Sequence, residues 1–130
     1  MPAATLKRVM LVDDESDIQM VARLALEAVG GYTVEVCGSG KEALDAVDAF
    51  APDLILLDVI MPEMDGPATF AAFRARAATS CVPIVFLTGK SRPEEIAHFQ
   101  ALGAAGVIAK PFDMRTLAGQ IQTIWEGLND

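Results

Sequence analysis

The sequence has few of the residues that cross-link a small protein or bind transition metals. It contains two cysteines and one histidine in 130 residues. Cys37 and Cys81 are far apart, stand among apolar neighbours and lack the spacing of metal ligands, so we expect two buried thiols of a reducing compartment. The composition therefore argues against a disulfide framework and against a zinc site.

Long apolar runs are also absent. No segment approaches the roughly 18 apolar residues that a transmembrane helix needs, and residues 1–8 lack the apolar centre of a signal peptide. We therefore expect a cytoplasmic protein that is not inserted into a membrane.

Positive charge is scarce. Ten Lys and Arg residues stand against 18 Asp and Glu residues, which gives a net charge of -8. This balance argues against a protein whose main role is to bind nucleic acid or an anionic membrane directly. It favours an acidic surface or an acidic site.

The length of the chain suits one domain. With 130 residues, of which 52% are hydrophobic, the chain can bury a core of its own without metals or cross-links. We expect an N-terminal tail over residues 1–6, one domain over residues 7–128 and no output domain within this chain.

Short apolar runs alternate with segments of helical period. Continuous runs at residues 9–12, 54–57, 84–87 and 107–109 predict strands that are covered on both faces. Thr33–Cys37 alternates apolar with polar residues, which predicts a strand nearer the edge of the sheet.

Five helices are expected between and after these runs. Their approximate spans are residues 18–29, 39–50, 67–76, 93–102 and 113–127. Ser39 and Glu42 have capping-box spacing at the start of the second. The expected buried positions of the first are Ile18, Val21, Leu24, Ala25, Ala28 and Val29.

Regular alternation of strand and helix predicts an α/β domain with a parallel sheet and helices on both faces. The pattern does not determine the order of the strands. In open sheets of this class, the functional site lies at the carboxyl ends of the strands.

The residues that follow the predicted strands have complementary chemistry. Asp13 and Asp14, followed by Glu15, come after the first strand, Asp58 after the third, Thr88 after the fourth and Lys110 after the fifth. Clustered carboxylates raise one another's pKa unless a cation neutralises them, and Mg²⁺ or Mn²⁺ prefers such oxygen ligands. The sequence therefore predicts a divalent-cation site that accepts a phosphoryl group.

Within such a site, each residue type suits one task. Asp58 is the candidate nucleophile, because a carboxylate can attack phosphorus and form an acyl phosphate without a general base. Lys110 can pair with a phosphoryl oxygen, and Thr88 can donate a hydrogen bond to another. Each residue alone would have an ordinary structural explanation, such as helix capping for Asp13 or Asp14.

Four segments resemble the receiver domain of bacterial two-component response regulators, and of chemotaxis regulators in particular. They are residues 12–15 (VDDE), 58–66 (DVIMPEMDG), 86–89 (FLTG) and 109–112 (AKPF). The resemblance spans almost the whole chain. It implies a (βα)₅ flavodoxin-like fold with strand order 2-1-3-4-5.

The resemblance also implies roles for individual residues. Asp58 would be the phosphoacceptor and a metal ligand, Asp14 a direct metal ligand, and Asp13 an acidic partner with contact through water as one option. The backbone carbonyl of Ile60 would complete the protein ligands. Thr88 and Lys110 would contact the phosphoryl group, with a cis peptide bond between Lys110 and Pro111.

One position departs from the pattern of the family. Receiver domains usually have Tyr or Phe three residues before the lysine, and this chain has Val107. That aromatic residue and the Thr88 hydroxyl would form the switch that reshapes the surface on activation. Ile60 and Lys90 occupy positions that, in the family, influence the lifetime of the acyl phosphate.

The partners that the resemblance implies are a sensor histidine kinase or a histidine phosphotransferase, and a downstream protein that reads the switch. We expect a monomer or weak dimer. The start at Met1 and Pro2 favours a single-domain regulator; a receiver cut from a longer regulator or hybrid kinase is the alternative.

Other functions fit less well. A pseudo-receiver that binds partners without phosphate would explain Val107, but not the complete set of acidic residues and lysine. A haloacid dehalogenase-type phosphatase would need Asp where Ile60 stands. Residues 38–41 (GSGK) lack the remaining P-loop residues, and His98, without a second ligand nearby, is expected at the surface.

Overall fold

The computed structural model describes residues 5–89 and 92–128. These residues form a parallel sheet with the strand order β2-β1-β3-β4-β5, as the resemblance implied. The strands are β1 (Arg8–Val12), β2 (Thr33–Cys37), β3 (Leu54–Asp58), β4 (Ile84–Thr88) and β5 (Gly106–Ala109). Every predicted strand is confirmed to within one residue at either end.

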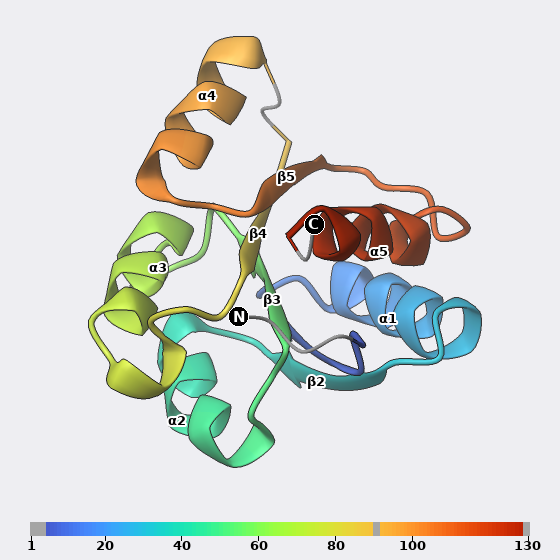
Figure 1. The fold of residues 1–130 in the computed structure, drawn as a ribbon, viewed down its shortest axis with the longest axis horizontal. Helices are drawn as coiled ribbons and strands as arrows, with labels where there is room; N and C mark the ends of the chain where they lie inside the picture. Colours follow the sequence, from blue (N-terminus) through green and yellow to red (C-terminus); the bar gives the residue numbers. More distant parts are fainter. Residues whose placement is uncertain (1–4, 90–91, 129–130) are drawn as a thin grey trace.

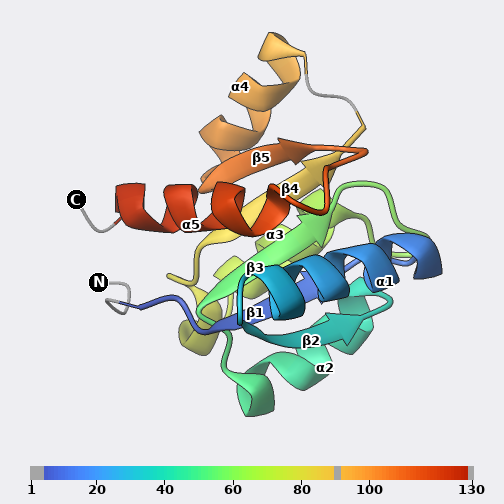
Figure 2. The ribbon, with the colours of Figure 1, turned by 90° about the vertical axis from the view of Figure 1, so that its right-hand side faces the viewer.

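Helices cover both faces of the sheet (Figures 1 and 2). One face carries α1 (Ser16–Leu24) with its π-helical extension η1 (Ala25–Val29), and α5 (Leu117–Leu128). The other face carries α2 (Gly40–Phe50), α3 (Gly66–Arg74) and α4 (Pro93–Leu102), with the short 3₁₀ helix η2 (Ala77–Thr79) before β4. The predicted α/β class is confirmed.

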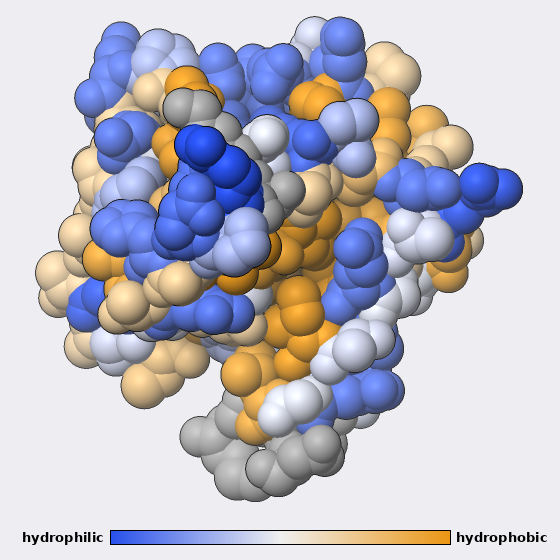
Figure 3. Space-filling view, turned by 90° about the horizontal axis from the view of Figure 1, so that it is seen from above, coloured by the Kyte–Doolittle hydropathy of each residue, from blue (hydrophilic) through white to orange (hydrophobic). Residues whose placement is uncertain are grey.

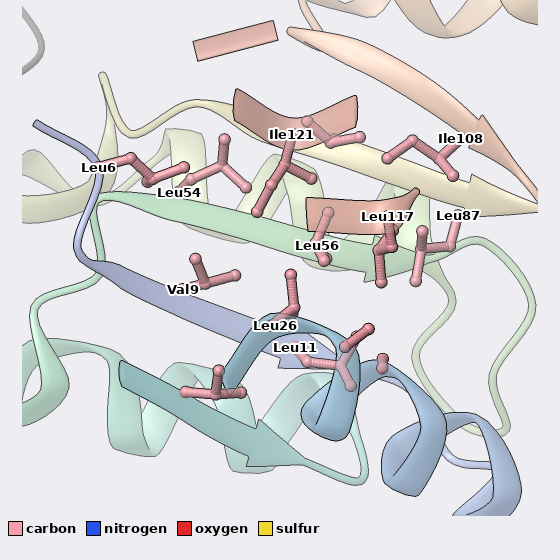
Figure 4. Close-up of a cluster of buried hydrophobic side chains, with 14 of the residues drawn as sticks. Leu6, Val9, Leu11, Leu26, Leu54, Leu56, Leu87, Ile108, Leu117 and Ile121 are labelled. Atoms are coloured by element: carbon pink, nitrogen blue, oxygen red, sulfur yellow. The ribbon is translucent and has the colours of Figure 1, made fainter. Parts of the chain in front are cut away.

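The strand residues divide into two apolar layers because successive side chains point to opposite faces. Val9 and Leu11 face α1 and α5, whereas Met10 and Val12 face α2 and α3. Figure 4 shows the first layer, in which Leu56 and Ile121 meet from β3 and α5. β3 and β4 are buried along their full lengths, and β2 lies at the edge as predicted.

The N-terminal boundary differs from the expectation. Leu6 was assigned to a tail over residues 1–6, of which residues 1–4 lie outside the described part of the chain. Leu6 is only 4% exposed and belongs to the layer that contains Leu54. A single apolar residue before a strand carries no periodicity, so its burial was not visible from the pattern.

The predicted buried face of the first helix is partly wrong. Val21, Leu24 and Val29 are 36%, 51% and 58% exposed, and Ala28 is exposed as well. Ala22 and Leu26 are fully buried instead. The helix has two overlapping apolar stripes, and the one that contains Ala22, Ala25 and Leu26, with i, i+3, i+4 spacing, packs on the sheet.

Two further expectations need correction. Helix α5 begins at Leu117, later than expected, because Asp113 folds the preceding residues into a turn by accepting hydrogen bonds from the backbone N–H groups of Thr116 and Leu117. Cys81 is exposed in the loop before β4, so only Cys37 is a buried thiol. Apolar neighbours in sequence do not bury a residue that lies in a loop.

The expected cap of α2 is present. The Ser39 side chain accepts a hydrogen bond from the Glu42 backbone N–H, and the Glu42 carboxylate accepts one from Gly38. Within the described residues, no helix combines the length and the apolar content that crossing a bilayer requires.

Candidate functional site

A pocket of about 400 Å³ opens at the carboxyl ends of the strands. Its walls come from the loops after β1, β3, β4 and β5, which the parallel sheet brings to one edge. The lining residues are Asp14, Glu15, Asp58, Val59, Ile60, Thr88, Gly89 and Lys110.

Three aspartates form a cluster at this edge. Asp13, Asp14 and Asp58 each offer a carboxylate oxygen, and these oxygens all lie within 4.8 Å of one another. They meet because β1 and β3 are neighbouring strands, with Val12 opposite Leu57. Asp13 is fully buried and Asp58 is 4% exposed, whereas Asp14 is exposed.

Lys110 lies against these carboxylates. Its Nζ atom is 2.7 Å from Asp13 Oδ2 and 3.0 Å from Asp58 Oδ1, and its side chain is 13% exposed. A third contact, of 3.4 Å, joins Nζ to Glu15 Oε1. The peptide bond between Lys110 and Pro111 is cis, as the resemblance implied.

The pKa values of Asp58 and Lys110 reflect opposing effects. Burial raises the pKa of Asp58, and the charges of Asp13 and Asp14 raise it further, against the hydrogen bond from Lys110. Burial alone would lower the pKa of Lys110, but its hydrogen bonds and charge pairing with Asp13 and Asp58 raise it overall. The lysine is therefore held as an ammonium ion beside carboxylates that repel one another.

Local hydrogen bonds hold the first acidic loop in place. The Glu15 backbone N–H donates to Asp13 Oδ1, and the Gln19 side chain donates to the Asp13 carbonyl at 2.6 Å. Gln19 lies on α1, so the start of this helix positions the loop after β1. Its contact was not foreseen, because a glutamine within a helix carries no sequence signal for such a role.

Close packing fixes the loop after β3. The Gly66 backbone N–H donates to the Val59 carbonyl at 2.8 Å. A Cβ atom at Gly66 would collide with the Asp58 carbonyl oxygen and stand 2.7 Å from Val59 Cα. Only glycine therefore lets α3 approach the backbone of Asp58 this closely.

The donor set fits a hard divalent cation. Carboxylate oxygens from Asp13, Asp14 and Asp58 converge, and Mg²⁺ and Mn²⁺ prefer oxygen ligands of this kind. Ile60 lines the same pocket, with a side chain that is 70% exposed. That the Ile60 backbone carbonyl binds the metal stays a prediction.

The structure separates the two expected switch positions. Thr88 ends β4, is 4% exposed and lines the pocket. Val107, on β5 opposite Phe86, is half-buried and lines a different hollow, together with Ile108 and Ile124. Figure 3, a view from above, shows hydrophobic residues gathered in a hollow of the surface. Lys90 lies outside the described residues.

The discounted motifs have structural explanations. Residues 38–41 lead into the capped start of α2, where Gly40 packs against Thr69 and Met64. His98 is exposed on α4. Neither lies in the pocket.

Known proteins are similar to this chain over most of its length. The model of the response regulator receiver domain family matches residues 9–122. A curated relative, a probable cyclic di-GMP phosphodiesterase of Vibrio cholerae serotype O1, is 33% identical over 115 residues, which cover 88% of this chain. The match covers only 26% of that longer protein.

Solved structures match almost end to end. Chemotaxis response regulator CheY4 of Vibrio cholerae is 34% identical, with a TM-score of 0.84 over 92% of this chain and 99% of its own. A response regulator from Desulfuromonas acetoxidans is 27% identical, with a TM-score of 0.83 over 94% of this chain and 98% of its own.

Proposed function

Because the chain belongs to the response regulator receiver domain family, we propose that it is a phosphoacceptor switch. Asp58 takes a phosphoryl group from a phosphohistidine on a sensor histidine kinase or a histidine phosphotransferase. The modified domain then favours a surface conformation that a downstream protein reads. On this proposal the domain signals in the cytoplasm and is not a metabolic enzyme.

One observation carries the proposal. Asp58 is nearly buried, yet it lines an open pocket in which its carboxylate meets an ammonium ion and two further aspartates. A carboxylate in such surroundings is stabilised poorly by solvent and is aimed at incoming phosphorus. This is the arrangement expected of a nucleophile in phosphoryl transfer.

The proposed reaction follows from these groups. An Asp58 carboxylate oxygen forms a bond to phosphorus, the bond from phosphorus to the donor imidazole nitrogen breaks, and its electron pair leaves on that nitrogen. Lys110 donates to a phosphoryl oxygen, and the Thr88 hydroxyl donates to another. A divalent cation on Asp13, Asp14 and Asp58, with the Ile60 carbonyl, would neutralise charge between the carboxylates and the phosphoryl oxygens.

The test is the intact mass after incubation with Mg²⁺ and acetyl phosphate. Wild-type protein is expected to gain one phosphoryl group, and Asp58→Asn and EDTA-treated wild type are expected to gain none. Rapid hydrolysis is controlled for by binding of beryllofluoride, which mimics the acyl phosphate. Failure of wild type in both measurements would overturn the proposal.

A second candidate rests on Val107. With valine at this position the hollow beside β5 is lined by aliphatic and polar side chains, and a partner could bind there irrespective of phosphate, as in a pseudo-receiver. Equal partner affinity with and without beryllofluoride would favour this reading, and an increase on beryllofluoride addition would favour the switch.

The context of the domain is part of the proposal. The match to 99% of the chain of chemotaxis response regulator CheY4 supports a single-domain regulator that acts by contact, as a monomer or weak dimer. The curated relative is a much longer protein, which supports the other arrangement, a receiver within a larger regulator. Sequencing the genomic locus separates the two.

A further inference from the structure

Three carboxylates surround the Lys110 ammonium group. An ammonium group has three N–H donors, and three carboxylates lie around Nζ: Asp13 at 2.7 Å, Asp58 at 3.0 Å and Glu15 at 3.4 Å. A phosphoryl group on Asp58 therefore competes with these carboxylates for Lys110.

Glu15 is the partner that can be released. Its contact is the longest of the three, and its side chain is 61% exposed, whereas the Asp13 side chain is fully buried. An exposed carboxylate regains water when it leaves the lysine, while a buried one would be left unpaired at a large cost in free energy. Exchange of Glu15 for a phosphoryl oxygen is thus the least costly rearrangement.

Glu15 also lines the pocket through which a donor enters. A carboxylate there repels an anionic phosphodonor, and the repulsion grows with the donor's charge. The roles proposed above for Asp58, Lys110 and Thr88 do not include a choice between donors according to their charge.

We infer that Glu15 determines donor specificity: it competes with the incoming phosphoryl group for Lys110 and disfavours doubly charged small phosphodonors relative to singly charged ones. This inference rests on the proposed function of Asp58. With acetyl phosphate, the Asp58 oxygen bonds to phosphorus and the bond to the acetate oxygen breaks, its electron pair leaving on acetate. With phosphoramidate, the bond to nitrogen breaks and ammonia leaves.

The test compares Glu15→Gln with wild type by the rate of phosphorylation at saturating Mg²⁺. Near neutral pH acetyl phosphate is a dianion and phosphoramidate a monoanion. By Coulomb's law for an exposed charge a few ångströms away, the variant should react about tenfold faster with acetyl phosphate and about threefold faster with phosphoramidate. The gains should shrink at high NaCl concentration, because salt screens exposed charges.

The matched control is Asp45→Asn, which removes one charge from an exposed position on α2 outside the pocket lining. It should leave both rates near those of wild type. Thermal unfolding of both variants checks that the fold is intact, since neither residue is buried.

The outcomes distinguish the role inferred for Glu15 from the phosphoacceptor function on which it rests. If wild type is phosphorylated and Glu15→Gln matches Asp45→Asn, or gains equally with both donors, the role of Glu15 is overturned and the phosphoacceptor function stands. If wild type reacts with neither donor and binds no beryllofluoride, the function itself fails. A slower Glu15→Gln would mean that Glu15 assists the reaction, which also overturns the inference.

Discussion

At the scale of single residues, the site is a balance between buried carboxylates and one ammonium ion. Asp58 is held with a raised pKa, mainly because it is desolvated. A raised pKa means that folding disfavours the charged form, so the ionised carboxylate weakens the fold that presents it. Functional groups commonly show this conflict between stability and chemistry.

This conflict predicts the stability of Asp58→Asn. In Mg²⁺-free buffer at pH 7, the variant should unfold at a temperature a few degrees above that of wild type, because it removes the disfavoured charge. Because the pKa of Asp58 is raised in the folded state, wild type loses stability as the pH rises from the pKa of Asp58 in the unfolded chain to its pKa in the folded protein. The difference should therefore shrink toward pH 4, and melting curves across this range check it. A constant difference would contradict the prediction.

Removal of the Lys110 side chain should instead lower the stability of the fold. Lys110→Ala leaves the fully buried Asp13 without its ammonium partner, and we expect a loss on the order of 2 kcal/mol in the free energy of unfolding. Added Mg²⁺ should restore part of this loss, because a cation can replace the missing charge. Urea denaturation with and without Mg²⁺ measures both effects.

The control for this substitution is Lys41→Ala, which truncates an exposed lysine on α2. It should change the free energy of unfolding by less than about 0.5 kcal/mol. A loss in Lys41→Ala as large as that in Lys110→Ala would show that general charge, and not the pairing in the site, decides the stability.

At the scale of elements, the first helix shows how packing selects among local patterns. Ala22 and Leu26 are buried against the sheet and α5, and Leu24 is 51% exposed. Both leucines have the same local propensity. Their environments differ because Leu26 lies one helical turn from the buried Ala22, on the face toward the sheet, whereas Leu24 is two residues from each of them and lies on the opposite side.

A matched pair of substitutions tests this assignment. Leu26→Ala should destabilise the protein by about 2–4 kcal/mol, because it leaves a cavity in a packed layer. Leu24→Ala, the control with the same chemical change, should cost under about 1 kcal/mol. Chemical denaturation of the two variants compares them directly. Similar losses would show that the face of this helix is assigned wrongly.

At the scale of the whole molecule, stability should be linked to the cation. The net charge of -8 is spread over the chain, but three aspartates are concentrated at one edge of the sheet. A ligand that binds only the folded state stabilises it by an amount that grows with ligand concentration. Cation binding should therefore be visible in the stability of the whole domain.

We expect Mg²⁺ to raise the free energy of unfolding by about 2.7 kcal/mol at a hundredfold excess over its dissociation constant. NaCl at the same ionic strength should give much less, which separates specific binding from general screening. Asp14→Asn should reduce the Mg²⁺ effect. Thermal shift measurements over a Mg²⁺ titration check these outcomes, and equal responses to both salts would contradict them.

The sequence alone determined where the strands lie and which side chains follow them. Apolar runs at residues 54–57 and 84–87 are local signals, since a strand buried on both faces needs consecutive apolar residues. Because parallel strands end at one edge, Asp58, Thr88 and Lys110 could be placed in one site without coordinates. The strand order came from the resemblance to receiver domains, not from the pattern.

Only the tertiary structure decided which of these groups are buried and which touch. The contact of Lys110 with Glu15, the exposure of Cys81 and the burial of Leu6 depend on segments that are distant in sequence. Periodicity reports the preference of a segment for a face, whereas burial and pairing depend on what packs against that face. For this reason the sequence could predict which residues line the site, but not which of them are buried and which contact one another.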